Sequence, residues 1–305
     1  MIKAVLPRFL RLCLKPALSP NVPVSVQRLI GSTIGQLLVP AFNTFSEQQT
    51  IAGVPVSIVR AKGDKPRNII IYLHGGGYVM GGVGSHGRLA GHLAKAANAE
   101  VWLVDYRLSP ENIFPAALED ALAVYTHLLS LGKDPAHITI AGDSAGGGLT
   151  LGTAIAIRGA ALPLPAALVL ISPWLDLSLS GDSHHTHVER DPMLSPAWLA
   201  QCADAYRGTL AAKDAHCSPL FASLRGLPPI LIQMGSEEIL LSDSEQLFEA
   251  ARKVKLKVEL QRFDGMWHVF QLHAGMLSES DRALRQIGQF ISQQTFAKAQ
   301  LAKVG

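Results

Sequence analysis

The residues best suited to do chemistry lie in a G-x-S-x-G pentapeptide, Gly142-Asp143-Ser144-Ala145-Gly146. It follows a short apolar run at residues 138–141 and opens a segment with helical character. In such a strand–turn–helix context, the central serine takes a strained backbone conformation and its hydroxyl stands above the carboxyl edge of a sheet. Glycines flank it because strand and helix approach too closely for a Cβ. A serine that only capped the helix would not require both glycines, so we interpret Ser144 as a nucleophile.

A second motif, His74-Gly75-Gly76-Gly77, directly follows another apolar run at residues 68–73. Consecutive glycines leave backbone N–H groups unscreened, and acyl transfer needs such donors where a carbonyl oxygen becomes an oxyanion. A flexible phosphate-binding loop or a turn loop is the alternative, but a P-loop is not expected because no G-K-[ST] ends the motif. We therefore expect this loop to stabilise an oxyanion, with His74 bracing it by hydrogen bonds rather than transferring protons.

A serine nucleophile needs a general base, and the chain has 11 histidines. Where G-x-S-x-G forms the elbow of an α/β-hydrolase, the chain order is nucleophile, acid, histidine. Residues 256–263 are predicted to form the last strand, and the loop after it puts His268 at the carboxyl edge of the sheet. His273 is a nearby rival, but it falls in an apolar segment predicted to be helical. His268 is therefore the expected base.

The acid is expected after the strand predicted at residues 230–234, where Glu237 and Glu238 are adjacent candidates. Asp243 is the third candidate, but a capping box over residues 242–245 (SDSE), at the start of a helix, explains it better. Asp264 is too near His268 in sequence for a side-chain pair at triad geometry. These arguments leave both Glu237 and Glu238 open.

The chemistry requires a scaffold, and the pattern around the motifs predicts alternating strands and helices. Uninterrupted apolar runs indicate strands buried on both faces, as in parallel sheets, whereas alternation at residues 54–58 indicates a half-buried edge strand. The apolar runs lie at residues 68–73, 100–104, 138–141, 167–171 and 230–234, and the predicted helices at 88–97, 115–131, 145–157 and 245–255. This order is the signature of a doubly wound α/β sheet.

Two regions depart from that alternation. Residues 1 to about 45 are expected to be helical or irregular, without a strand. Residues from about 175 to 220 are long for a connection, which usually has a few residues, and this indicates a functional or separate sub-domain. Its histidines His184, His185 and His187 suggest a metal site, but no H-E-x-x-H or matching carboxylate spacing is present. We interpret them as a cluster on a surface loop and expect no metal.

Composition excludes several classes of protein. The 305 residues include 27 Lys+Arg against 24 Asp+Glu, and 48% are hydrophobic. Disorder requires low hydrophobicity with high net charge, and a nucleic-acid binder concentrates its basic residues in a stripe. The sequence has neither property. It also has no stretch of about 18 uncharged apolar residues, so no transmembrane helix is expected.

The N-terminus and the cysteines bear on the compartment. Basic residues from Lys3 to Lys15 interrupt the apolar ones, so an export signal with an unbroken apolar region is not expected. An amphipathic helix is predicted instead, packed on its own protein, with a membrane-surface helix as the alternative; its apolar face comprises Leu6, Phe9, Leu10, Leu12 and Leu14. The three cysteines form no C-x-x-C pair, which favours buried free thiols in a reducing compartment. We expect a cytoplasmic protein.

Taken together, the motifs resemble the hormone-sensitive-lipase family of the α/β-hydrolases, specifically its bacterial esterases. The matching segments are residues 74–77 (HGGG), 105–111 (DYRLSPE), 114–117 (FPAA), 142–147 (GDSAGG), 191–195 (DPMLS) and 265–270 (GMWHVF). The resemblance implies one α/β-hydrolase domain over residues 1–305, with a mostly parallel sheet between helices. It also implies a helical cap made of residues from about 1–45 and 175–220.

The resemblance assigns roles to individual residues. The family's nucleophile falls on Ser144 and its base on His268. Its oxyanion donors fall on the N–H groups of Gly76, Gly77 and Ala145, and its acid falls on Glu238. Most members carry an aspartate there, often within D-P-L. Glutamate is one methylene longer, but either carboxylate can orient the imidazole.

The implied activity is that of a cofactor-free serine carboxylesterase, acting on short- to medium-chain acyl esters through an acyl-enzyme. Its partner is a small-molecule ester, and many relatives form homodimers through the last strand and the adjoining helix. A deacetylase or lactonase on the same triad is the alternative enzyme. A ligand receptor without catalysis is the alternative from another class, although the nucleophile, base and acid positions all carry competent residues.

Overall fold

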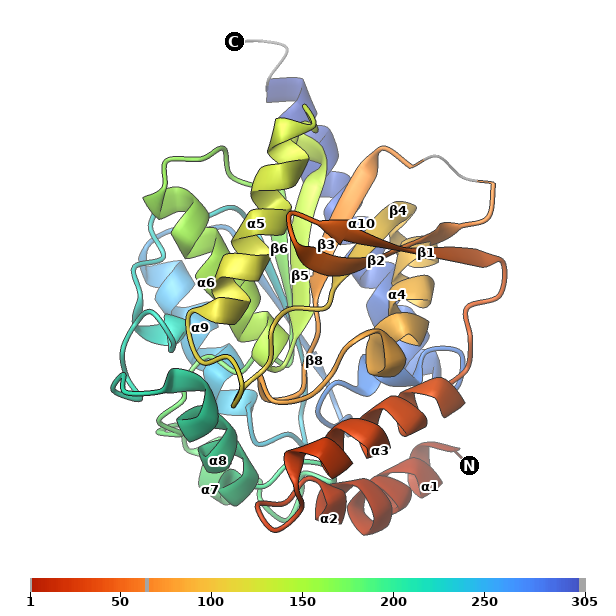
Figure 1. Cartoon of the computed structure of the whole chain (residues 1–305), viewed down its shortest axis with the longest axis vertical. Helices are drawn as coiled ribbons and strands as arrows, with labels where there is room; N and C mark the ends of the chain where they lie inside the picture. Colours follow the sequence, from red (N-terminus) through yellow and green to blue (C-terminus); the bar gives the residue numbers. More distant parts are fainter. Residues whose placement is uncertain (1, 64–65, 302–305) are drawn as a thin grey trace.

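A computed structural model of the chain describes residues 2–63 and 66–301, and its centre is one eight-stranded sheet (Figure 1). The strand order is β1-β2-β4-β3-β5-β6-β7-β8. The strands are β1 (Thr44–Ile51), β2 (Val54–Ala61), β3 (Asn68–Leu73), β4 (Ala99–Val104), β5 (Ile138–Asp143), β6 (Ala167–Ile171), β7 (Ile230–Gly235) and β8 (Val258–Phe263). Strands β3 to β8 pair in parallel, whereas β1 and β2 form an antiparallel extension. The prediction of an α/β class with a mostly parallel sheet is confirmed.

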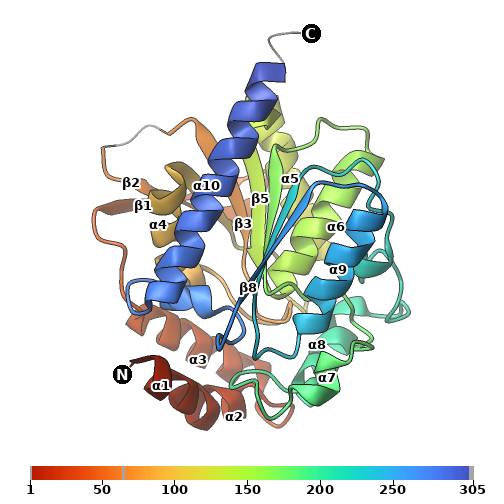
Figure 2. The ribbon, with the colours of Figure 1, turned by 180° about the vertical axis from the view of Figure 1, so that it is seen from behind.

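Helices cover both faces of the sheet, as the two opposite views in Figures 1 and 2 show. On one face lie α4 (Val83–Ala97) and α10 (Ser278–Leu301). On the other lie α5 (Ala116–Ser130), α6 (Ala145–Gly159) and α9 (Leu241–Lys253). Single turns η2 (Pro135–His137) and η4 (Phe270–His273) lie in connections.

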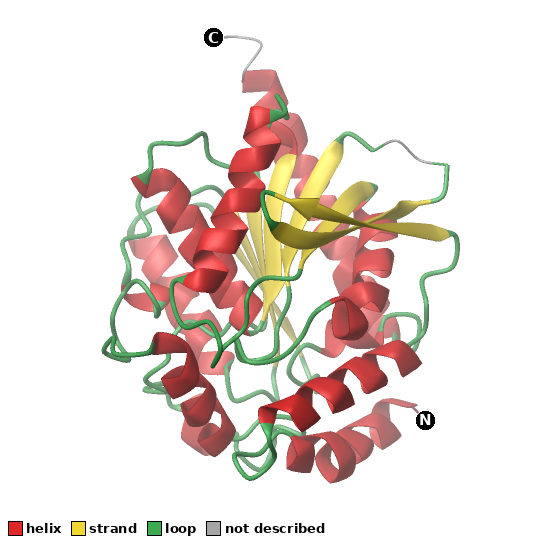
Figure 3. Cartoon of the chain, in the orientation of Figure 1, coloured by secondary structure: helices red, strands yellow, loops and turns green. Residues whose placement is uncertain are grey.

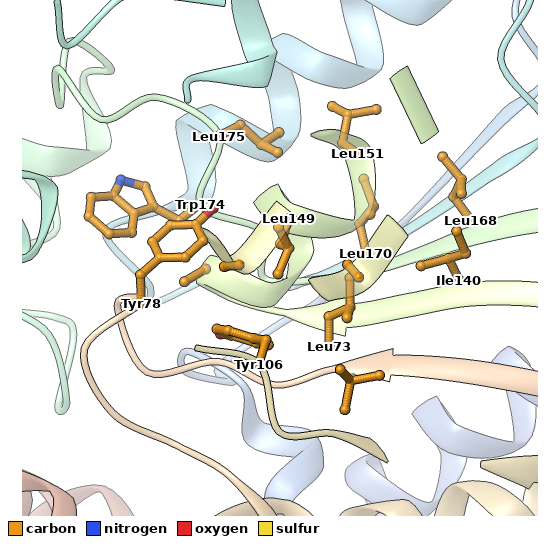
Figure 4. Packing of buried hydrophobic residues seen from close by; sticks show 14 of the residues in the cluster. Leu73, Tyr78, Tyr106, Ile140, Leu149, Leu151, Leu168, Leu170, Trp174 and Leu175 are labelled. Carbon is orange, nitrogen blue, oxygen red and sulfur yellow. The ribbon is translucent and has the colours of Figure 1, made fainter. Parts of the chain in front are cut away.

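Each buried strand contributes to two hydrophobic cores. In β3, Ile69, Ile71 and Leu73 belong to the core on the α5–α6 side, whereas Ile70 and Tyr72 belong to the core on the α4–α10 side. Both sets are buried, which is why these strands appear in the sequence as apolar runs without alternation. Figure 4 shows part of the first core, including side chains of β3, β5, β6 and α6.

Two helical segments, distant in sequence, lie together beyond one end of the sheet (Figure 3). The N-terminal segment contains α1 (Ile2–Phe9), the π-helix η1 (Leu10–Leu14), α2 (Lys15–Ala17) and α3 (Val24–Leu37). The inserted segment contains α7 (Ser183–Thr186), α8 (Pro196–Arg207) and η3 (Pro219–Phe221). Hydrogen bonds join the two: Lys15 Nζ donates to Asp191 O at 2.7 Å, and Trp198 Nε1 donates to Gln27 Oε1 at 2.7 Å.

The predictions for the first two strands are wrong in part. β1 starts at Thr44, at the end of a region expected to have no strand, and it is missed because its mostly exposed residues are polar. It pairs with β2 through a turn in which Ala52 and Gly53 have φ of 49° and 85°. β2 was expected at an edge, but it is an interior strand between β1 and β4.

The predicted capping box at residues 242–245 is also wrong. Helix α9 starts earlier, at Leu241, and its N-cap residue Leu240 supplies no side-chain hydrogen bond. Asp243 instead accepts hydrogen bonds on Oδ2 from the backbone N–H groups of Leu175 (2.7 Å) and Asp176 (3.0 Å). Buried amides need an acceptor, and this tertiary requirement decides the orientation of the carboxylate.

The expected apolar face at the N-terminus is divided. Leu10 and Leu14 are buried, but Phe9 and Leu12 are exposed. Part of this stretch forms a π-helix, whose wider turn changes which residues share a face. Within residues 2–63 and 66–301, no helix has the length and apolarity needed to cross a membrane.

Candidate active site

Ser144 stands at the turn between β5 and α6 with a backbone that non-glycine residues rarely adopt. Its φ is 54° and its ψ is −123°, a conformation whose strain is characteristic of functional sites. It occupies the N-cap position of α6 without making a side-chain cap hydrogen bond. Its backbone is fixed from both sides, since its N–H donates to Ile171 O and its carbonyl accepts from Trp174 N–H, both at 2.9 Å. The hydroxyl is therefore held in place but not used as a helix cap.

The two glycines around Ser144 are sterically required. A Cβ on Gly142 would lie 2.6 Å from Leu73 O, and one on Gly146 would overlap Leu73 O and approach His74 O to 2.5 Å. The start of α6 thus packs directly on the end of β3, which brings the serine next to the glycine loop that follows that strand.

The glycine loop supplies backbone donors beside the serine. Gly76 and Gly77 have φ of 119° and 61°, which favour glycine. Among the described residues, no acceptor binds the N–H of Gly76, Gly77 or Ala145. Gly76 and Ser144 line the same cavity. Backbone N–H groups that lack an acceptor are the kind of donor that an oxyanion requires.

Asp143, the residue before the serine, holds this loop in place. Its Oδ1 accepts from Gly75 N–H at 3.0 Å and from the Tyr72 hydroxyl at 2.8 Å, and its Oδ2 lies 3.2 Å from His86 Nε2. Burial disfavours the charged carboxylate, but the charge of His86 and the hydrogen bonds from His86 and Tyr72 outweigh it, so the pKa of Asp143 is lowered. The carboxylate therefore stays ionised and links the elbow to the loop.

His74 braces the loop from the other side. Its ring stacks on Tyr106 at 4.2 Å between centroids, and its Nδ1 lies 2.8 Å from Gly75 O, to which it can donate. Burial, together with the nearby His86, lowers the pKa of His74 to about 3. The ring is thus neutral at physiological pH, which suits a structural role.

His268 is brought into the same cavity and is paired with Glu238. Glu238 Oε2 lies 3.2 Å from His268 Nδ1, and both side chains are buried. Burial raises the pKa of Glu238, while hydrogen bonds from His268 and Ser172 oppose that shift. An N–H on Nδ1 that donates to this carboxylate leaves Nε2 of His268 as a free base.

The adjacent residue Glu237 points elsewhere. It forms two hydrogen bonds with Arg190, at 2.9 and 2.8 Å, and the Arg190 hydrogen bond lowers its pKa. The backbone sets the different directions of the two glutamate side chains. Glu237 N–H donates to Met266 O at 2.9 Å, and a Cβ on Gly235 would come within 2.6 Å of Met266 C. The loops after β7 and β8 are packed together, and this presents Glu238, not Glu237, to His268.

The cavity that joins these groups has a volume of about 700 Å³, counting space open to solvent. Ser144, Gly76 and His268 line it. Its other walls are mainly aliphatic and come from both helical segments, including Leu14, Leu18, Ile34, Leu38, Met193 and Leu194. An apolar group attached to a carbonyl at Ser144 can therefore be buried.

Several polar residues differ from expectation or were missed. His184 was expected on the surface, yet it is fully buried, with Nε2 3.2 Å from Asp243 Oδ1. Cys13 is exposed, whereas Cys202 and Cys217 are buried as expected. No group of three or more His, Cys, Asp or Glu side chains in the described part of the chain is arranged to hold a metal ion. His86, which contacts Asp143, was not predicted to be part of the site, and its only signal in the sequence is its position shortly after the glycine loop.

A family model described as "alpha/beta hydrolase fold" matches residues 70–272 of the chain. The chain is 43% identical over 222 residues to an acetyl-hydrolase from Streptomyces hygroscopicus, an alignment that covers 73% of this chain and 74% of the relative. It is 34% identical over 253 residues to an esterase from Acinetobacter venetianus, covering 81% and 84% of the two chains.

Solved structures of esterases superpose on nearly the whole chain. A crystal structure of an esterase from the bacterial hormone-sensitive lipase family superposes with a TM-score of 0.92 at 36% identity, covering 96% of this chain and 98% of the other. The esterase EstE5, in crystals soaked with p-nitrophenyl butyrate, superposes with a TM-score of 0.91 at 40% identity and the same coverage.

Proposed function

This chain belongs to the hormone-sensitive-lipase family of the α/β-hydrolases and is a carboxylic ester hydrolase, and we propose that Ser144, His268 and Glu238 are its catalytic triad. The observation that carries the proposal is the arrangement around one cavity. A strained serine and a histidine line it, the histidine is paired with a buried carboxylate, and the N–H groups of Gly76, Gly77 and Ala145 have no acceptor in the described part of the chain. This set matches the requirements of acyl transfer.

In the acylation step, Ser144 Oγ adds to the ester carbonyl while its proton passes to Nε2 of His268. The carbonyl oxygen becomes an oxyanion that accepts hydrogen bonds from the N–H groups of Gly76, Gly77 and Ala145. The C–O bond to the alcohol then breaks, and His268 gives its proton to the departing oxygen. Glu238 stabilises the intermediate imidazolium and fixes the tautomer.

In the deacylation step, His268 takes a proton from water and the resulting hydroxide attacks the acyl carbonyl. The same three N–H groups hold the second oxyanion. Its collapse releases the carboxylic acid and returns the proton to Ser144. The sequence of steps needs no cofactor.

We propose that the N-terminal and inserted segments form a cap that closes over the acyl group and limits its length to short and medium chains. The aliphatic cavity wall contributed by both segments supports this. The acetyl-hydrolase relative and the use of a butyrate ester with EstE5 agree with a small acyl group.

We also propose a homodimer through β8, one of the two edge strands of the sheet. The three free thiols support a reducing, cytoplasmic compartment.

The decisive experiment combines kinetics with covalent labelling. Ser144→Ala and His268→Ala should each lower kcat on p-nitrophenyl butyrate by about 10⁵–10⁶-fold, and the double variant should lose little more, because the two residues act as a unit. A phosphonate should add once to the wild-type protein, on Ser144, as read by mass spectrometry. Near wild-type hydrolysis by Ser144→Ala would refute the assignment.

A further inference from the structure

Exposed apolar side chains are concentrated on the N-terminal segment. Eight of the 12 large hydrophobic side chains that are exposed in the described part of the chain belong to residues 2–42. Four of them, Ile2, Val5, Phe9 and Leu12, are spaced by three, four and three residues along α1 and η1. Leu12 is 76% exposed, and Leu37 at the end of α3 is 80% exposed. Clusters of this kind mark interaction surfaces.

The same segment carries the positive charge of the protein. Residues 1–46 contain five basic residues and no Asp or Glu, so the remaining 22 basic and 24 acidic residues leave the rest of the chain at −2. Lys3 is paired with Glu279, and Arg28 with Glu111. Arg11 donates to the carbonyls of Glu189 and Arg190, which leaves its charge uncompensated by those partners.

The inner side of this segment lines the catalytic cavity. Leu14, Leu18, Ile34 and Leu38 line it together with Ser144, whereas Leu12 and Leu37 are exposed. In both ribbon views α1, α2 and α3 lie side by side at the outside of the molecule (Figures 1 and 2). A surface that binds the outer side would therefore lie close to the cavity.

Charge decides between the candidate occupants. A second copy docked through the same face would bring the exposed basic residues Lys3, Arg8 and Arg11 against the same three residues of the other copy, because a two-fold interface places each patch on itself. An anionic lipid surface offers negative headgroups to the basic residues and acyl chains to the apolar ones, which is the pattern of interfacial helices.

We propose that the outer face of the N-terminal segment, defined by the exposed side chains of Ile2, Val5, Phe9, Leu12, Leu29 and Leu37 together with those of Lys3, Arg8 and Arg11, binds an anionic lipid–water interface. Binding there brings the cavity to apolar esters dissolved in that interface. That this face supplies substrate to Ser144 rests on the proposed function. The binding of lipid by this face does not require catalysis.

The test is sedimentation of the full chain with two kinds of vesicle, pure phosphatidylcholine and equal parts phosphatidylcholine and phosphatidylglycerol. The wild-type protein should bind the anionic vesicles and should be released at about 1 M NaCl, where the screening length is about 3 Å. The double variant Val5→Asp/Leu12→Asp, or Leu29→Asp on α3 if that variant fails to fold, should bind at least about tenfold more weakly. For whichever of these variants is used, kcat/KM on soluble p-nitrophenyl butyrate should stay within about twofold of wild type.

Matched controls lie outside the N-terminal segment: Leu131→Asp and Lys133→Gln change an exposed leucine and an exposed lysine that follow α5. Both should bind vesicles as wild type does. Absence of binding to anionic vesicles, or unchanged binding by the aspartate variants, would overturn the proposal. So would a wild-type dimer that these variants dissociate, since the occupant would then be a second copy.

The outcome can be separated from that of the proposed function. Ser144→Ala should bind anionic vesicles as wild type does, because Ser144 is buried and is not part of the outer face. If Ser144→Ala kept its hydrolytic activity, the proposed catalytic role of Ser144 would be refuted. The proposal of lipid binding would still be decided by the vesicle measurements alone.

Discussion

Glu238 and His268 form a buried pair, with Oε2 and Nδ1 3.2 Å apart, although they lie 30 residues apart on different loops. The adjacent carboxylate, Glu237, instead accepts hydrogen bonds from Arg190 of the inserted segment. Two neighbouring glutamates, which are equivalent in the sequence, therefore have different partners. The packed backbone of the loops after β7 and β8 imposes this difference.

The first prediction concerns these two glutamates. Glu238→Ala should lower kcat on p-nitrophenyl butyrate by about 10⁴-fold, because loss of the triad carboxylate leaves the imidazole in an unfixed tautomer. Glu237→Ala removes only a half-exposed ion pair and should stay within about twofold. Steady-state kinetics of the two purified variants make the comparison, and a larger loss for Glu237→Ala would reverse the assignment.

The second prediction concerns pH and the carboxylate of Asp143, whose pKa is lowered in the folded protein. An ionised group with a lowered pKa stabilises the fold above its unfolded pKa, near 3.9, and this contribution is lost as pH falls through the folded value. Asp143→Asn cannot ionise. It should be less stable than wild type by about 2 kcal/mol at pH 7, and the difference should shrink as pH falls below about 4.

Urea unfolding at several pH values measures that difference. Asp264→Asn is the control, since the Asp264 side chain is 91% exposed and lies 3.6 Å from Arg262. Its difference from wild type should stay near zero throughout. A difference for Asp143→Asn that grew on acidification would show that the carboxylate is not held ionised in the folded state.

The third prediction compares two glycines of the same helix. A Cβ on Gly146 would overlap the backbone of Leu73, whereas one on Gly152 would meet nothing within 4 Å. Gly146→Ala should therefore displace the elbow and abolish activity or folding. Gly152→Ala should raise stability by about 0.5–1 kcal/mol, because alanine favours helix over glycine. Thermal unfolding and activity assays test both, and an active, stable Gly146→Ala would contradict the packing of α6 on β3.

The fourth prediction concerns acyl-chain length and uses two adjacent leucines. Leu38 lines the cavity, whereas Leu37 is exposed. Leu38→Ala enlarges the space beside Ser144 and should raise kcat/KM for octanoate relative to butyrate by about tenfold, since each buried methylene contributes about 0.8 kcal/mol. Leu37→Ala should leave this ratio unchanged. A p-nitrophenyl ester series from acetate to palmitate measures it, and a maximum at palmitate for the wild-type protein would contradict the proposed limit on chain length.

Much of the fold follows from local patterns. Apolar runs predict β3 to β7 because strands buried on both faces must be apolar at every position. The steric demand of the elbow likewise predicts Gly142 and Gly146 as neighbours of a nucleophile, since only glycine fits there. The apolar pattern does not predict β1, because most of its residues are exposed and polar. Only its pairing with β2 defines it as a strand.

The sequence by itself determined the motifs, their order and the class of sheet that carries them, because each depends on the chemistry of residues close together in the chain. The tertiary structure alone decided that Glu238 rather than Glu237 contacts His268, that Asp243 and His184 pair in the interior, and which leucines of the N-terminal segment face the cavity. These outcomes depend on which backbone segments pack against each other, and a local pattern does not contain that information.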